Sequence, residues 1–342
     1  MSLTGKVSPK NFNLHPSLYP WARKLYDQAI ANTWYPHEIP LKEDLEDWAN
    51  MTDDEKYAVE FVMSFFNPTE LLVNRVLALG VYPYLKSAEC HLYLAKQMWE
   101  EANHCVAFEY VLETLPLDRS KIYEMHIQTP SMKAKEDFVN KYINRMTQEH
   151  YDIETTDGKK DFIRNLIAYN IIMEGIWFYS GFMVILSFRQ RNKLRNLGSM
   201  INWVLRDESL HLKFGINLVL SVLDENSEIV SGEFAKEIKE IIIEGVNLEI
   251  NYNKDLFPRG ILGLNADYVN QYVQYVADRR MEELGFAPYY KSTNPAKWMS
   301  TATDVYELVN FFEVQNTSYE VNARAQKNNN DEIQPDQPEL NI

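Results

Sequence analysis

One stretch of the chain, residues 165–188, is apolar almost throughout and yet has a glutamate near its centre. It reads NLIAYNIIMEGIWFYSGFMVILSF, with Glu174 in the middle. The stretch is long enough to span a bilayer, but a carboxylate at that depth in a membrane is costly. No second segment of the sequence resembles a span. We therefore interpret the stretch as a helix buried on all sides in a large bundle, without membrane association, and the burial of Glu174 needs its own explanation.

The rest of the chain also favours helices. Only 12 glycines and 14 prolines occur in 342 residues, and 46% of residues are hydrophobic. Alternation with period two, which indicates strands, is essentially absent. Thr52 and Glu55 form a capping box that predicts a helix from about residue 53, which Pro68 either kinks or divides. The other helices are predicted over 21–33, 85–113, 160–189, 190–223, 231–256 and 264–284, with two shorter ones within 116–160.

Charge and cysteine content exclude several classes of function. With 34 Lys and Arg against 49 Asp and Glu, the formal charge is −15. This balance argues against nucleic-acid binding and against a polybasic membrane anchor. The two cysteines, Cys90 and Cys105, cannot form a disulfide scaffold or a four-cysteine zinc site. Because the first residues also lack the apolar core of a secretory signal, we expect a cytoplasmic protein.

Two of the seven histidines have a glutamate three positions earlier, as Glu101-x-x-His104 and Glu208-x-x-His211. Residues three apart lie on one face of a helix, so each pair can bind one metal ion. Roughly 0.7 such pairs are expected by chance in a sequence this rich in glutamate, so the pairs alone are weak evidence.

The context strengthens these pairs. Each is preceded by a glutamate in an apolar segment: Glu70 lies 31 residues before Glu101, and Glu174 lies 34 residues before Glu208. Each interval fits one antiparallel helix hairpin. Two hairpins form a four-helix bundle with four glutamates and two histidines facing inward, the ligand set of ferritin-like di-iron and di-manganese proteins. The predicted fold is therefore all-α, a ferritin-like four-helix bundle core with additional helices.

Charge balance supports a dinuclear metal centre. Four buried carboxylates would repel one another, whereas two divalent cations would neutralise them. The alternative is that Glu70 and Glu174 are buried acids paired with arginine. Arg75 could pair with Glu70, but the basic residues nearest to Glu174, Arg164 and Arg189, are too distant along a helix. Carboxylate and imidazole ligands suit manganese and iron.

Seven segments carry a resemblance to a known family: WYPHEIP (34–40), FFNPTE (65–70), EEANH (100–104), IIMEGIWFYSGF (171–182), RDESLH (206–211), PRGILGL (258–264) and NFFE (310–313). With these motifs the chain resembles the small, radical-generating subunit of class I ribonucleotide reductase. The resemblance implies an oxygen-activating dimetal cluster whose oxidant generates a thiyl radical in a large partner subunit, for deoxyribonucleotide synthesis. It also implies a homodimer.

The resemblance assigns roles to individual residues. It implies one metal site at Glu70, Glu101 and His104 and a second at Glu174, Glu208 and His211, with Glu101 and Glu208 bridging. Other roles concern radical transfer and the surroundings of the cluster. Asp207 would hydrogen-bond His104, Trp34 would extend that chain, Tyr319 would relay the oxidising equivalent to the large subunit, and Phe178 and Phe182 would form a dry wall beside the cluster.

One position departs from the common pattern of this family. Most class I small subunits have a tyrosine four residues after the first histidine, where this chain has Phe108. A phenyl ring has no phenolic proton to lose, so Phe108 cannot store a tyrosyl radical. With Glu70 as first ligand, the pattern resembles class Ic, the chlamydial type, which uses a manganese–iron cofactor. Fe/Fe and Mn/Mn centres remain alternatives.

The predicted domain organisation is a metal-binding domain over residues 1–312 and a flexible tail over 313–342. The tail is polar and would dock on the large subunit. Two other functions use the same ligands. The first is a ligand-binding dimetal oxidase of the same superfamily, and the second is a non-catalytic, ferritin-like metal-binding protein.

Overall fold

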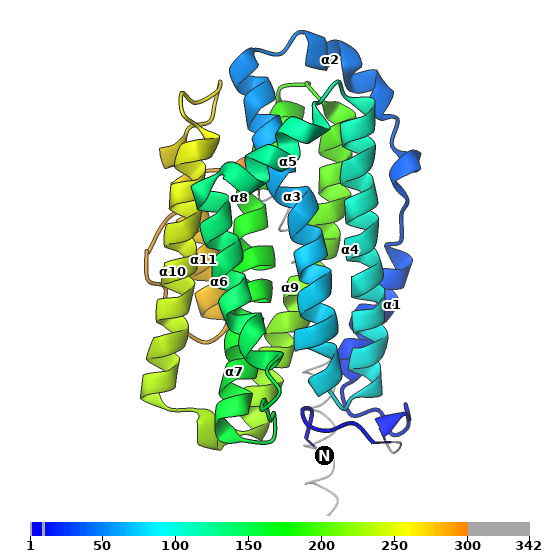
Figure 1. Ribbon diagram of the computed structural model, residues 1–342, viewed down its shortest axis with the longest axis vertical. Helices are drawn as coiled ribbons and strands as arrows, with labels where there is room; N and C mark the ends of the chain where they lie inside the picture. The colour runs from blue at the N-terminus through cyan, green and yellow to red at the C-terminus, as the bar shows by residue number, and fades with distance from the viewer. Residues whose placement is uncertain (1, 9–10, 300–342) are drawn as a thin grey trace, which may run out of the picture. The chain divides into compact units, whose positions relative to one another are not determined.

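The computed structural model describes residues 2–8 and 11–299, which Figure 1 draws in colour. Met1–Ala296 form one compact unit, and a second unit begins at Lys297. Nearly all of that second unit lies outside the described residues. The predicted boundary near residue 312 and the predicted tail over 313–342 lie there too.

The described residues form eleven α-helices and one π-helical segment, without a β-strand. The predicted all-α class is therefore confirmed. In chain order the helices are α1 (Pro20–Ala31), α2 (Leu45–Ala49), α3 (Asp53–Gly80), α4 (Ala88–Thr114), α5 (Arg119–Gln128), α6 (Pro130–Met146), α7 (Thr156–Leu166), the π-helical segment η5 (Ile167–Trp177), α8 (Phe178–Gln190), α9 (Arg195–Glu225), α10 (Gly232–Leu256) and α11 (Ala266–Glu283).

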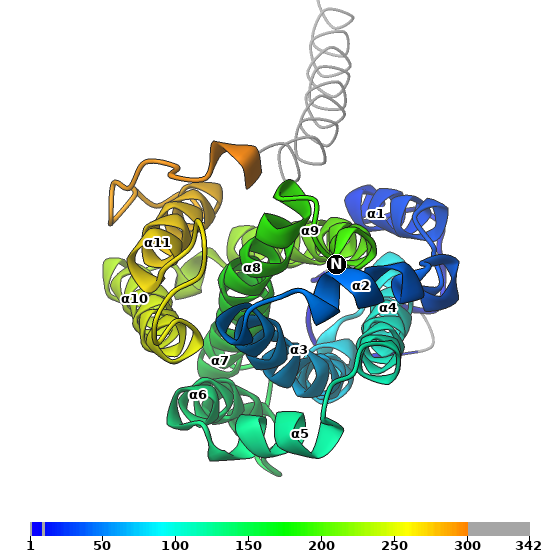
Figure 2. The same cartoon turned by 90° about the horizontal axis from the view of Figure 1, so that it is seen from above.

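Four helical segments form the central bundle. The α3 helix packs along α4, while η5 and α8 pack along α9. These two hairpins then meet, with α3 against α8 and α4 against α9. In Figure 2, α1 covers the outer side of α4 and α9, and α10 and α11 cover the opposite side. The arrangement is the ferritin-like bundle with additional helices that the spacing of the glutamates predicts.

The first helix of the bundle begins at the predicted capping box. The backbone N–H of Glu55 donates to Oγ1 of Thr52 at 3.2 Å, and the N–H of Thr52 donates to the Glu55 carboxylate at 3.1 Å. The helix continues through Pro68 to Gly80 as one element. Proline removes one backbone hydrogen bond from a helix, and here the packing of buried residues on both sides of Pro68 outweighs that loss.

The apolar stretch forms the wall of the bundle that contains Glu174. Among the described residues, Thr156–Gln190 is the one helix long and apolar enough to cross a membrane, and its apolar window is 100% buried in the fold. It is a core helix. The helix predicted over 160–189 is confirmed, but its backbone over residues 167–177 is π-helical and not α-helical. Neighbouring helices contact this π-helical backbone. Arg280 on α11, for example, donates through Nε to the carbonyl of Gly175 at 3.0 Å.

Candidate metal centre

Six acidic and imidazole side chains meet at the centre of the bundle. All six are at most 1% exposed, and they come from four segments: Glu70 from α3, Glu101 and His104 from α4, Glu174 from η5, and Glu208 and His211 from α9. They fall into two groups, and in each group the potential ligand atoms lie within 4.8 Å of one another: Glu70, Glu101, His104 and Glu208 in the first, and Glu101, Glu174, Glu208 and His211 in the second. Glu101 and Glu208 belong to both groups, as expected for bridging carboxylates.

Both histidines present the same ring nitrogen to the carboxylates. Nδ1 of His104 lies 3.2 Å from Glu208 Oε1 and 3.6 Å from Glu70 Oε2. Nδ1 of His211 lies 3.0 Å from Glu101 Oε1 and 3.3 Å from Glu208 Oε2. Because Nδ1 of His104 also lies 3.7 Å from Glu101 Oε2, the glutamate-histidine spacing of three brings carboxylate and imidazole together on each helix, as predicted.

Several buried atoms in this cluster make no hydrogen bond of good geometry, although charged groups lie close to them. They are Oε2 of Glu70, Oε2 of Glu101, Oε1 of Glu208 and Nδ1 of His104. Buried polar atoms without a partner are costly, so a cluster of them requires a physical explanation. Cations among these atoms would satisfy them together. The residues thus fit two metal ions, and their oxygen and imidazole donors suit manganese or iron.

The electrostatics of the cluster lead to the same conclusion. Burial raises the pKa of Glu70 and of Glu174 well above the usual value, and neighbouring carboxylates add to the shift for both. Burial also opposes the charged form of Glu101, but the adjacent His211 and His104 hold its pKa below the usual value. Without cations Glu70 and Glu174 therefore favour their protonated forms, whereas divalent ions would stabilise the full set of carboxylates.

A hydrogen-bonded chain leads outward from the first histidine. Nε2 of His104 lies 3.4 Å from Oδ2 of Asp207, and Nε1 of Trp34 donates to the same oxygen at 2.7 Å. Trp34 is 3% exposed, and its ring stacks on His104 with centroids 6.2 Å apart. The structure brings these three residues into the contacts that the resemblance implies.

Four aromatic rings from three helices lie together in the core of the bundle. Phe66 is the hub, with ring centroids 5.3 Å from Phe108, 5.3 Å from Phe178 and 5.4 Å from Phe182. All four rings are fully buried. Phe178 and Phe182, which are predicted to form a dry wall beside the cluster, are thus packed with Phe108 and Phe66. Sequence reasoning missed Phe66, although it lies four residues before Glu70 and thus on the same helical face.

Several further polar residues around the cluster were also missed. Gln97 donates to both Glu101 and Glu174 at 3.3 Å, and Asn170 donates to Glu174 at 2.7 Å. Each of these amides lies four residues before a predicted ligand, a spacing that could have revealed them.

Two phenols, Tyr93 and Tyr169, are fully buried, and their hydroxyls have no hydrogen-bond partner among the described residues. Burial raises the pKa of both well above the usual value, and nearby carboxylates add to the shift.

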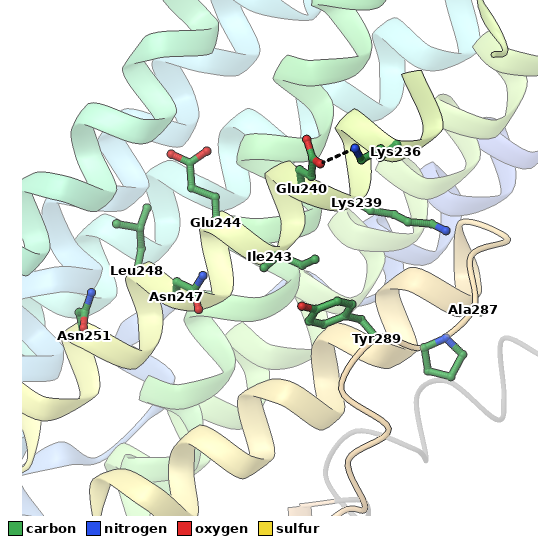
Figure 3. Close-up of a pocket in the computed structure, with 11 residues that line it drawn as sticks. Lys236, Lys239, Glu240, Ile243, Glu244, Asn247, Leu248, Asn251, Ala287 and Tyr289 are labelled. Carbon is green, nitrogen blue, oxygen red and sulfur yellow. Dashed lines mark ion pairs between the residues drawn. The ribbon is translucent and has the colours of Figure 1, made fainter. Parts of the chain in front are cut away.

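Tyr319, the predicted relay, is outside the described residues. A surface groove of about 810 Å³ runs between the outer face of α10 and residues 287–289. Figure 3 shows its lining, including the ion pair of Lys236 and Glu240. None of the six cluster residues lines this groove, so it gives no access to the cluster.

The chain is similar, in sequence and in structure, to proteins of one family. The sequence matches the family "Ribonucleotide reductase, small chain" over residues 11–295. It is 39% identical over 309 residues to a ribonucleoside-diphosphate reductase subunit beta from Chlamydia pneumoniae, covering 90% of this chain and 89% of the relative. Among solved structures, a ribonucleotide reductase R2 subunit from Clostridium botulinum matches with TM-score 0.76 and 27% identity, over 83% of this chain and 88% of that one. A dimanganese(II)-NrdF from Streptococcus sanguinis has the same fold, with TM-score 0.71 and 20% identity over 82% and 93% of the two chains.

Proposed function

Because this chain belongs to the ribonucleotide reductase small-chain family, we propose that it generates the oxidising equivalent with which a separate large subunit starts the reduction of ribonucleoside diphosphates. The observation that carries the proposal is the convergence of four glutamates and two histidines, all buried, in two groups that share Glu101 and Glu208. A structural role for so many buried acids is implausible on energetic grounds, since no described lysine or arginine pairs with any of the four.

The residues divide into two metal sites. Glu70, Glu101 and His104 would hold one ion, and Glu174, Glu208 and His211 the other, with Glu101 and Glu208 shared. Such a carboxylate-bridged pair of redox-active ions supplies one-electron oxidation chemistry after reaction with oxygen or a reduced oxygen species. Gln97 and Asn170 orient the carboxylates by hydrogen bonds, and Asp207 orients His104.

The protein also has to control where the oxidising equivalent goes. The rings of Phe66, Phe108, Phe178 and Phe182 exclude water from one side of the cluster. Trp34, Asp207 and His104 form the route that we assign to radical transfer, because an indole N–H bound to a carboxylate can give up an electron and a proton together. Tyr319 would take over at the large subunit. Substituting Tyr319→Phe should abolish turnover with the large subunit and leave the metal content unchanged.

Phe108 bears on the identity of the cofactor. It occupies the position at which most class I small subunits have a tyrosine, and it has no phenolic proton. We therefore propose a cluster of the chlamydial, class Ic type, with manganese and iron, in which the metal ions themselves retain the oxidising equivalent. Fe/Fe and Mn/Mn centres are the alternatives, and the dimanganese protein among the structural relatives has the second of these.

The experiment that tests the proposal is reconstitution of the metal-free protein with Mn(II), Fe(II) and both, followed by aeration and assay with a large subunit. We expect turnover only after metal loading, and most with both metals. Electron paramagnetic resonance of the aerated sample should lack a tyrosyl signal. Full turnover without metal would refute the proposal, and a stable tyrosyl radical would refute the class Ic assignment.

A further inference from the structure

The second histidine of the cluster has its own chain of polar contacts, a hydrogen bond followed by an ion pair. Nε2 of His211 lies 3.0 Å from Oε2 of Glu100. The other oxygen of Glu100 lies 3.2 Å from Nζ of Lys96, one helical turn earlier on α4. The side chains of both residues are nearly inaccessible, 6% exposed for Lys96 and 2% for Glu100. The ammonium group of Lys96 is also 3.9 Å from the centre of the Trp99 ring, which covers it from the outside.

This chain mirrors the one at the first histidine. In each case an acid directly precedes a bridging glutamate: Glu100 before Glu101, and Asp207 before Glu208. Each acid contacts the histidine of the opposite helix, so that Glu100 on α4 contacts His211 on α9, while Asp207 on α9 contacts His104 on α4. The two acids therefore connect α4 and α9 reciprocally through the two imidazoles.

Each outer acid also has a cation of its own. Lys96 accompanies Glu100, and Arg206 accompanies Asp207 with N–O distances of 3.4 Å. Four ligand carboxylates balance two divalent ions, and each outer acid is balanced by its own side-chain cation. An extra uncompensated carboxylate beside His211 would instead disturb that balance in a medium of low dielectric constant.

Stability alone does not account for the pair of Lys96 and Glu100. Burying two charges costs several kcal/mol of desolvation per ion as an order of magnitude, and apolar replacements of such pairs are often neutral or stabilising. A carboxylate that accepts from the outer nitrogen of a metal-binding histidine, in contrast, fixes its tautomer and ring orientation. We propose that Glu100 and Lys96 are positioning residues for His211 that support metal binding at the Glu174–His211 half of the cluster. This inference rests on the proposed metal centre.

The test is a titration of the metal-free full-length protein with Mn(II), in which electron paramagnetic resonance measures the free ion. We expect two ions per wild-type chain. In Glu100→Gln, which keeps an acceptor but loses the charge, we expect one of the two affinities to fall about 10- to 100-fold and the other to stay the same. Lys96→Met should lower the affinity for the same ion. Lys96→Arg, which keeps the positive charge, should retain most of that affinity.

Two controls separate this role from a folding defect. Glu109→Gln alters another acid of α4 that bonds to Asn67 and Tyr123 and does not contact the cluster, so both affinities should remain at the wild-type value. The unfolding temperature of each metal-free variant shows whether the bundle is intact. Wild-type affinities at both sites in Glu100→Gln, or an equal loss at both, would overturn the proposal. A wild-type chain that binds no Mn(II) would instead remove the metal centre itself, and the role of the pair with it.

Discussion

Asn170 shows how one side chain serves two segments of the bundle. Its amide donates to Oε2 of Glu174 on the same segment at 2.7 Å and to the backbone carbonyl of His211 on α9 at 3.0 Å. The side chain is fully buried, and Gly215 on α9 faces it directly, where a Cβ atom would overlap the amide. The missing side chain at residue 215 therefore lets Asn170 orient a ligand of the cluster.

This close approach predicts a specific loss in Gly215→Ala. The added methyl group should displace Asn170, lower the free energy of unfolding by about 1–3 kcal/mol, and weaken metal binding at the Glu174 half of the cluster. Denaturant unfolding and Mn(II) titration would measure the two effects. The control is Gly232→Ala on α10, where no atom lies within 4 Å of the added carbon and little change is expected. Unchanged metal binding in Gly215→Ala would show that Asn170 does not orient Glu174.

Trp34 allows a test of the assigned radical route. Trp34→Phe retains an aromatic ring beside His104 but removes the N–H that donates to Asp207. We expect both metal ions to bind, and turnover with the large subunit to fall more than about 100-fold, because a phenyl ring cannot replace the indole in proton-coupled electron transfer.

The matched control for this change is Trp48→Phe, a buried tryptophan on α2 that packs beside Lys56. Its turnover should stay near the wild-type value. If Trp34→Phe retains full turnover, the route does not pass through Trp34.

Among the helices, the apolar stretch was the easiest to predict and also the one whose local geometry differed most. Its length and composition identify a buried helix, and the structure confirms this. The π-helical turns around Glu174 also make hydrogen bonds to neighbouring helices, such as the one that the Arg280 guanidinium donates to the Gly175 carbonyl. Such contacts join residues 105 positions apart in the sequence, so local periodicity cannot reveal them. π-helical turns are frequent at functional sites, as here.

Glu55, at the start of α3, also binds the segment that connects α8 to α9. Besides capping the helix, Glu55 pairs with Arg191 at 2.8 Å and with Lys193 at 3.0 Å, where the chain turns from α8 into α9. Burial opposes its charged form, but hydrogen bonds from Lys193, the Thr52 backbone and Arg191 hold the pKa of Glu55 below the usual value. Glu55 thus connects the two hairpins of the bundle at this end.

These contacts predict a pH-dependent effect of Glu55→Gln. A carboxylate with a lowered pKa in the folded state stabilises above its unfolded pKa of about 4.3, and this contribution is lost as the pH falls through the folded value. At neutral pH we expect the variant to lose about 1–3 kcal/mol of unfolding free energy, and the difference should shrink below about pH 4. Glu240→Gln, in an exposed pair with Lys236, should change stability little at any pH. A difference for Glu55→Gln that stays constant down to pH 3 would contradict the assignment.

For the molecule as a whole, the sequence predicts the bundle and its six central side chains well, because their spacing follows directly from helix geometry. Helical periodicity and charge balance are enough to predict that Glu70, Glu101 and Glu174 face the centre of the bundle. The supporting residues were less accessible to such reasoning: Lys96 and Glu100 look like an ordinary i, i+4 surface pair until α9 is placed beside them. The roles of Trp34 and Asp207 came from resemblance, and no pattern within the chain would have paired them across 173 positions.

The outer surface of the bundle gives a prediction about assembly. Leu71 and Leu79, eight residues apart on α3, are 62% and 44% exposed, and Val106 on α4 is 58% exposed. We expect a second copy of the chain to cover these residues, since exposed apolar side chains on two neighbouring helices indicate an interface. The double variant Leu79→Glu/Val106→Glu should shift the protein from dimer to monomer in sedimentation velocity. Ile127→Glu on α5, at a side chain 73% exposed, is the control and should leave the mass unchanged. A monomeric wild-type protein would contradict this expectation.

The central claim is that this bundle holds two redox-active ions among its buried acids, and crystallographic anomalous scattering at the manganese and iron edges tests it most directly. After loading with both metals, the account predicts two peaks, one between His104 and Glu70 and one between His211 and Glu174, with Glu101 and Glu208 reaching both. Data from well-ordered crystals without a peak at either position would contradict it.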